Sequence, residues 1–89
     1  MLDEIAQLLV DVPGISVVVR GHTDSDGVPE SNLQLSTDRA AMVAVALVDG
    51  GLERSSVSWE GVGSAEPVII GGVEDKVMSR RVEIFVLAA

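Results

Sequence analysis

The residues best suited to recognising a small charged molecule lie in one stretch, Gly21-His22-Thr23-Asp24, and on the helix predicted to follow it. Asp24 supplies a carboxylate after an apolar run, and Arg39 supplies a guanidinium fifteen residues later. The planar fork of an arginine matches a carboxylate, and an aspartate pairs with an ammonium group. The pair predicts a two-pronged receptor for a zwitterion with an amine and a carboxylate. Alternatively, Asp24 and Arg39 form an ion pair with each other that serves only the fold.

Polar residues near this pair have both a structural and a functional interpretation. Thr23 can bond a ligand or fix the turn in which it lies. Asn32 can bond a ligand or the loop backbone, and either Ser31 or Asn32 can cap the start of the helix. Free N–H groups at such a helix start also favour a nearby carboxylate. On the same helix, Leu35 and Val43 are expected to be core residues.

His22 invites a catalytic or metal-binding interpretation together with Asp24 and Asp26. The sequence has a single histidine and no cysteine, and no nucleophile is paired with a base, so little supports a metal-dependent hydrolase. We expect a histidine held by hydrogen bonds near the loop. The run from Asp24 to Gly27 superficially resembles a calcium loop, but its glycine comes too early and no bidentate glutamate follows at the required spacing. We therefore expect no metal, no cofactor and no catalysis.

The elements that position these residues follow from the hydrophobic pattern. Helices are predicted over 2–12, 32–47 and 73–80, and strands over 15–20, 55–61 and 81–87. Segment 68–70 is apolar, but two glycines follow it at once, and we predict irregular structure there. Strand, helix and strand in succession predict a right-handed parallel crossover. The predicted fold is α+β, with a small mixed sheet of about three strands and helices packed on one face.

Composition restricts both the partners and the core. The 89 residues suit one small domain, and the net charge of -8 argues against binding to nucleic acid or to an anionic membrane surface. Trp59 and Phe85 are the only aromatic residues, so the core must be aliphatic. No apolar run approaches the roughly 18 residues that a transmembrane helix needs. The start of the chain has no basic segment typical of a signal peptide.

An ordered set of short motifs runs through the chain. These motifs are Gly-His-Thr-Asp at 21–24, Asn-x-x-Leu-Ser-x-x-Arg-Ala-x-x-Val at 32–43, Gly-x-Gly at 61–63, Pro67 and Arg-Arg-Val-Glu-Ile at 80–84. Together they extend over nearly the whole chain, from about Ile15 to Val86. In this order the motifs resemble the OmpA-like domain, the peptidoglycan-binding module shared by OmpA C-terminal domains, peptidoglycan-associated lipoprotein and MotB.

The resemblance implies a non-enzymatic anchor that binds the diaminopimelate residue of the peptidoglycan stem without a covalent bond. In the family pattern, the aspartate and the arginine of these motifs take the two charged ends of that residue. This assigns the ammonium group to Asp24 and the carboxylate to Arg39, with Thr23, Asn32 and Arg80 in support. Arg80 can help position the ligand carboxylate or brace Asp24. The resemblance also implies an envelope location outside the cytoplasm, with a targeting segment upstream.

Two sites within the chain depart from the family pattern. Ser79 stands where asparagine is usual, and serine lacks the paired donor and acceptor of an amide. We therefore expect a weaker tie between this position and the loop. Gly71-Gly72 replaces the polar turn that usually follows the proline, which suggests a rearranged loop.

The start of the chain departs as well. Family domains generally open with a strand before the first helix, and nothing precedes Leu2 except Met1. We expect a single domain, residues 1–89, excised from or truncated relative to a longer envelope protein. The missing strand would leave a sheet edge unpaired, which invites a homodimer or reduces stability. The alternative function is therefore a degenerate module that mediates protein interaction or dimerisation without binding the cell wall.

Overall fold

The computed structural model describes residues 2–87 of the chain. The elements are α1 (Leu2–Leu9), β1 (Ser16–Gly21), α2 (Pro29–Asp49), the 3-10 turn η1 (Arg54–Ser56), β2 (Val57–Gly61), β3 (Ile69–Ile70), β4 (Val73–Glu74), α3 (Lys76–Ser79) and β5 (Val82–Leu87). Three strands form one sheet in the spatial order β2-β1-β5, and β3 and β4 form a separate two-stranded sheet. The predicted α+β fold with a small mixed sheet and helices is confirmed.

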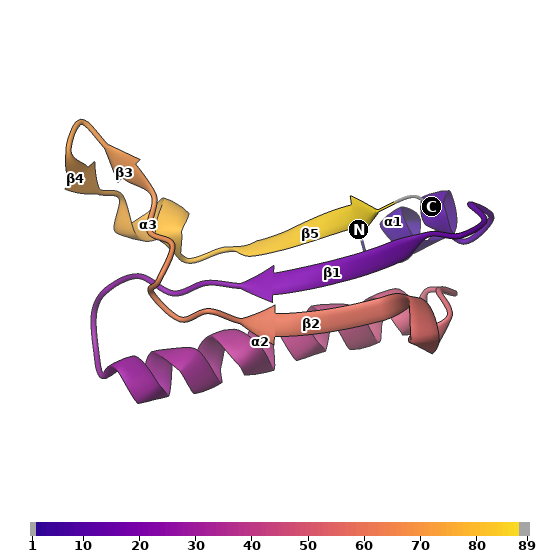
Figure 1. Ribbon diagram of the computed structural model, residues 1–89, viewed down its shortest axis with the longest axis horizontal. Helices are drawn as coiled ribbons and strands as arrows, with labels where there is room; N and C mark the ends of the chain where they lie inside the picture. The colour runs from indigo at the N-terminus through magenta and orange to yellow at the C-terminus, as the bar shows by residue number, and fades with distance from the viewer. Residues whose placement is uncertain (1, 88–89) are drawn as a thin grey trace.

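The three-stranded sheet is mixed because its central strand has neighbours of both directions. β1 runs parallel to β2, with Gly21 opposite Gly61, and antiparallel to β5, with Gly21 opposite Val82. The parallel pair confirms the predicted crossover through α2. Figure 1 shows α2 running along one face of the sheet, while the β3–β4 hairpin lies at the end of the molecule opposite to α1. The end of β1 and the start of α2 therefore meet near the hairpin.

Helix α2 packs against β1 and β2 through a stripe of small side chains. Its buried residues recur every three or four positions, as one face of a helix requires: Asn32, Ser36, Ala40, Ala44 and Leu47. The core is aliphatic, as predicted, and its buried apolar residues are Ala6, Val17, Val19, Ala40, Ala44, Leu47, Leu52 and Val57. Small side chains allow the helix backbone to lie directly on the strands.

Two glycines show how close this approach is. A Cβ atom added at Gly21 would lie 2.1 Å from the backbone oxygen of Ser36, and one added at Gly61 would lie 2.2 Å from the backbone nitrogen of Thr37. Both contacts are far shorter than real carbon contacts. The ends of β1 and β2 can therefore lie under α2 only because neither residue has a side chain.

Helix α2 begins earlier than its sequence pattern predicts. It starts at Pro29, and the preceding Val28 makes no side-chain capping bond. Ser31 and Asn32 therefore lie inside the helix, and the capping role suggested for them is wrong. The reason is that proline suits the first helical turn, where its missing N–H group has no partner to lose. Gly50 follows the last helical residue, as expected.

Other expectations also need correction. Segment 68–70, predicted to be irregular, contributes β3 to a hairpin, because Gly71 and Gly72 have positive φ angles of 61° and 81° and close the turn. The helix predicted over 73–80 is limited to α3, because β4 takes its first residues. Leu35, predicted to be core, is 42% exposed. No helix within residues 2–87 has both the length and the apolar character to cross a membrane.

Candidate functional site

The turn after β1 holds Asp24 in a defined orientation. The N–H of Thr23 donates to the carbonyl of Gly63 at 2.9 Å, and the Thr23 hydroxyl donates to the Asp24 carbonyl at 2.9 Å. The backbone N–H of Asp26 donates to Asp24 Oδ1 at 3.0 Å, which is the pattern of an Asx turn. One oxygen of the Asp24 carboxylate is thus held by its own loop.

Asn32 and Arg80 reach the same turn from two other elements. The Asn32 amide donates to the carbonyls of Asp26 at 2.9 Å and Asp24 at 3.5 Å. Arg80 Nε lies 3.4 Å from Asp24 Oδ2, where the aspartate side chain is 13% exposed and the arginine side chain 51% exposed. The structure therefore brings Thr23, Asp24, Asn32 and Arg80 together. Asn32 binds loop backbone, and Arg80 braces the carboxylate.

The loop at 25–26 is tied to the segment that follows the hairpin. Lys76 Nζ lies 2.7 Å from Asp26 Oδ1, and this hydrogen bond is the main reason that the pKa of Lys76 is raised. The Ser25 hydroxyl donates to the carboxylate of Glu74. These contacts join the turn that carries Asp24 to β4 and α3.

Arg39 lies apart from this cluster. It is an exposed residue of α2, seven positions after Asn32, and this spacing places both on one flank of the helix. Among residues 2–87 its guanidinium makes no hydrogen bond or ion pair, and no oxygen of Asp24 lies within 4.0 Å of it. The structural ion pair considered as an alternative for Asp24 and Arg39 is therefore not formed.

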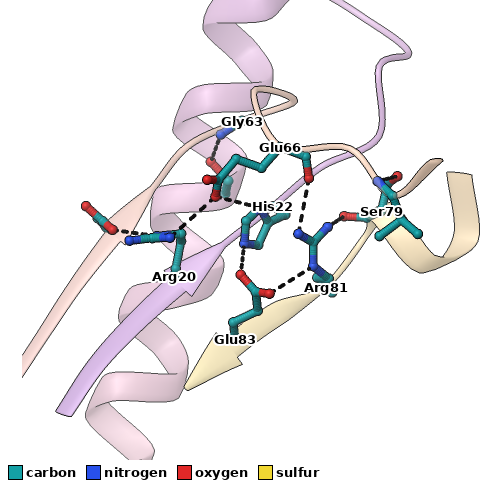
Figure 2. Close-up of polar contacts among 10 residues, drawn as sticks. Arg20, His22, Gly63, Glu66, Ser79, Arg81 and Glu83 are labelled. Carbon is teal, nitrogen blue, oxygen red and sulfur yellow. Dashed lines mark hydrogen bonds and ion pairs between the residues drawn. The ribbon is translucent and has the colours of Figure 1, made fainter. Parts of the chain in front are cut away.

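A second polar cluster, which the motifs did not reveal as a unit, surrounds His22 (Figure 2). The His22 side chain is fully buried, and its Nε2 lies 2.5 Å from Oε1 of Glu83 on β5. The other Glu83 oxygen lies 3.4 Å from Arg81 Nε. Arg81 Nη2 in turn donates to the carbonyl of Glu66 at 3.1 Å. The signal in the sequence was Glu83 itself, within the Arg-Arg-Val-Glu motif, but nothing local connected it to His22.

The electrostatics of Glu83 follow from these neighbours. Burial raises the pKa of its carboxyl group, but the hydrogen bond and charge of His22 and the charge of Arg81 outweigh it, so the pKa lies below its ordinary value of 4.5. Glu83 therefore keeps its charge in the folded protein and can hold the imidazole beside the strand end that carries Asp24.

Ser79, which replaces the usual asparagine, bonds the loop directly. Its side chain is fully buried, and its hydroxyl accepts the backbone N–H of Val68 at 3.0 Å. The carbonyl of Ser79 also accepts a bond of 3.4 Å from Arg81 Nη1. The serine thus supplies a tie between α3 and the loop that precedes β3.

Removal of this tie tests its contribution. We expect Ser79→Ala to lower the free energy of unfolding by about 1–2 kcal/mol, because the Val68 N–H loses its acceptor in a partly buried place. Ser58→Ala, on the exposed side of β2, serves as the control and should change stability by less than about 0.5 kcal/mol. Urea titration followed by circular dichroism measures both. Equal midpoints for the two variants would show that the Ser79 bond contributes nothing.

The chain matches known proteins along nearly its whole length. The family model described as the OmpA family matches residues 1–81. This chain belongs to the OmpA family. Relatives of the domain include the probable lipoprotein YiaD of Escherichia coli strain K12, which is 39% identical over 84 residues, covering 93% of this chain and 38% of that protein.

Another relative carries a binding function in its name. The peptidoglycan-binding protein ArfA of Mycobacterium tuberculosis strain H37Rv is 34% identical over 87 residues, covering 97% of this chain and 27% of that protein. The OmpA-family domain thus spans little more than a third, or less, of the length of these two curated relatives.

Solved structures have the same fold as this OmpA-family domain. The C-terminal domain of Helicobacter pylori MotB superposes with a TM-score of 0.83 at 28% identity, covering 99% of this chain and 70% of that one. The peptidoglycan-associated lipoprotein of Burkholderia pseudomallei gives a TM-score of 0.84 at 29% identity, covering 97% of this chain and 74% of that one. The α+β arrangement of the OmpA-family domain is therefore shared with both.

Proposed function

We propose that this OmpA-family domain binds peptidoglycan without a covalent bond, through the diaminopimelate residue of the peptide stem. Relatives named as a peptidoglycan-binding protein and as a peptidoglycan-associated lipoprotein support this proposal. The observation that carries it is the pair of opposite charges on the turn before α2 and on the middle of that helix. The Asp24 carboxylate is fixed by its loop and the Arg39 guanidinium has no partner among residues 2–87.

Each charge has a distinct role in the proposed complex. The Asp24 carboxylate accepts the ligand ammonium group at Oδ2, the oxygen that the loop backbone leaves open to side chains. Arg39 takes the ligand carboxylate, and because it has no ion pair to break, binding costs it little beyond side-chain ordering. Thr23 and Asn32 hold the turn, and Arg80 keeps Asp24 in place.

The proposed ligand follows from this arrangement. The side chain of diaminopimelate ends in a carbon with both an ammonium group and a carboxylate, so it can engage Asp24 and Arg39 at once. A lysine side chain ends in an ammonium group alone and would leave Arg39 unused. The domain would therefore act as a non-enzymatic anchor that holds an envelope protein to the cell wall. Relatives named as outer membrane proteins and lipoproteins support the envelope location.

A titration with free amino acids tests the ligand. We expect meso-diaminopimelate to shift the backbone amide resonances of Asp24 and Asn32 in a saturable manner, because the first carries the ammonium-binding carboxylate and the second holds its loop. Nα-acetyl-lysine amide at equal concentration offers only an ammonium group, because its α-amine and α-carboxyl groups are blocked. As the control it should shift them at least about tenfold less, for loss of one charge-assisted contact. Equal shifts with the blocked lysine would contradict the choice of diaminopimelate.

A second candidate function, self-association, is favoured by one edge of the sheet. β5 has β1 on one side and no other strand of the described chain on its far side. Its last residues Phe85, Val86 and Leu87 are 38%, 47% and 54% exposed. An edge of this kind can add a strand from a second copy, and antiparallel pairing of β5 with itself would close a two-fold dimer.

Sedimentation tests this proposal. We expect the wild-type domain to form a dimer as its concentration rises, and Val86→Lys to remain monomeric because a charge on an edge strand opposes pairing. Val45→Lys, at an exposed position of α2, is the control for added charge elsewhere and should dimerise normally. A wild-type domain that stays monomeric at millimolar concentration would refute self-association and leave cell-wall binding unaffected.

A further inference from the structure

The polar cluster around His22 contains more negatively charged side chains than positively charged ones. Its carboxylates are Glu60 on β2, Glu66 in the loop before β3 and Glu83 on β5, and its guanidiniums are Arg20 on β1 and Arg81 before β5. Arg20 lies 2.6 Å from Glu60 and 3.5 Å from Glu66, and Arg81 lies 3.4 Å from Glu83. Three negative charges thus face two positive ones. Figure 2 shows His22 between Glu66 and Glu83.

One nitrogen of the buried imidazole lacks a partner. His22 Nε2 is bonded to Glu83, whereas Nδ1 is buried without a hydrogen bond and lies 3.9 Å from Glu66 Oε1. A neutral imidazole carries only one N–H group and can satisfy one of these two carboxylates as a donor. The imidazolium carries two. Protonation of His22 would therefore supply both the missing donor and the third positive charge.

We propose that His22 is a positioning residue that fastens the loop 62–68 to the sheet when it is protonated. In the neutral state the ring binds Glu83 alone. In the protonated state Nδ1–H also donates to Glu66, which draws the loop toward β1 and β5. Charged groups from β1, β2, β5 and the loop all face this cluster. Within residues 2–87, the hydrogen bond that α2 makes to the loop comes from the Ser36 hydroxyl, which accepts the N–H of Gly63 at 2.9 Å.

A divalent cation fits the same cluster less well than a proton. Oxygen and nitrogen atoms of His22, Glu66 and Glu83 lie within 4.8 Å of one another, which is close enough for shared coordination. However, Arg20 and Arg81 already lie near these carboxylates, and two added charges would leave the cluster positive. Burying an unbalanced charge is costly. One added proton makes the net charge of the cluster zero, whereas a divalent cation makes it positive.

Fastening the loop affects the turn that carries Asp24. The carbonyl of Gly63, within the loop, accepts the N–H of Thr23 at 2.9 Å. A loop held by Glu66 keeps this acceptor in place and so orders the turn that carries the Asp24 carboxylate. This last step rests on the proposed function, and it predicts tighter binding to peptidoglycan with His22 protonated than with His22 neutral.

The proposed fastening of loop 62–68 by protonated His22 is called the clamp below. Nuclear magnetic resonance tests the clamp without any ligand. The ring ¹⁵N resonances of His22 report whether the ring is protonated. In the wild-type domain we expect the protonated ring to show a slowly exchanging Nδ1–H. The amides of Gly63 and Ala65 should exchange about three- to tenfold more slowly after correction for the intrinsic effect of pH, as one partly screened ion pair allows. Glu66→Ala, which removes the acceptor, should abolish the change, whereas Glu53→Ala, at an exposed position just before η1, should retain it.

Either of two results would overturn the clamp. One is loop exchange that is equal in the neutral and protonated wild-type domain. The other comes from a titration with Zn²⁺ at neutral pH. If the resonances of the His22 ring and of Glu66 shifted and reached saturation at one equivalent of zinc, the cluster would be assigned to a metal. Sacculus pull-down from pH 5 to 8 adds the functional test, in which Glu66→Ala should lose the pH dependence. If no variant bound sacculi at any pH, the proposed function would fail, and the ring and exchange measurements would still decide the clamp.

Discussion

Asp24→Asn and Arg39→Ala are each expected to weaken binding to isolated sacculi by about tenfold to a hundredfold, with no change in the fold. Each substitution removes one charge-assisted contact to the proposed ligand, and such contacts contribute about 1.5–3 kcal/mol. Asparagine keeps an oxygen that can accept the Asp26 N–H, so the turn should remain intact. Within the described chain, Arg39 makes no hydrogen bond or ion pair whose loss would disturb α2.

Matched controls separate this site from the general charge of the domain. Asp49→Asn and Arg54→Ala change the same kinds of charge at exposed positions, the first at the end of α2 and the second in η1. Both should bind sacculi like the wild-type domain. Circular dichroism and thermal unfolding of all four variants verify the fold. If Asp24→Asn and Arg39→Ala also bound at wild-type strength, the assignment of the site would be wrong.

The largest loss of stability is expected from Gly21→Ala. The added Cβ would lie 2.1 Å from the carbonyl oxygen and 2.9 Å from the carbonyl carbon of Ser36, which are backbone atoms of α2 and cannot rotate away. The helix would have to move off the sheet by more than an ångström. Overpacking of this kind costs about 3 kcal/mol or more, a large part of the stability of a small domain. Displacement of α2 would also move Asn32 and Arg39.

Gly71→Ala provides the control for this substitution. No atom lies within 4 Å of a Cβ built at Gly71, but its φ of +61° makes alanine unfavourable there. We expect a loss of only about 1 kcal/mol from this backbone conformation. Chemical denaturation of both variants gives the comparison. Similar free energies of unfolding would mean that the contact between β1 and α2 is looser than the distances indicate.

Local pattern accounts for much of the fold. The β-branched run before Gly21 predicts β1, the apolar residues of the long helix predict the face that Ala40, Ala44 and Leu47 bury, and alternation predicts β5. These features were predictable because their cause is repetition within one segment. The exposure of Leu35 was not predictable, because it depends on which face of α2 packs on the sheet, and the buried face passes through Ser36 and not through Leu35.

The amino-acid sequence by itself determined the three strands of the main sheet and the long helix, the aliphatic core, the acidic surface and the family motifs that single out Asp24 and Arg39. Only the tertiary structure decided that Arg80 contacts Asp24 and that Glu66 and Glu83 lie on either side of His22. These partners are separated by between 44 and 61 residues in the chain. Helical and strand periodicities repeat over a few residues and carry no information about such distant pairs, so the pairing of β1 with β5 and the path of the loop set those contacts.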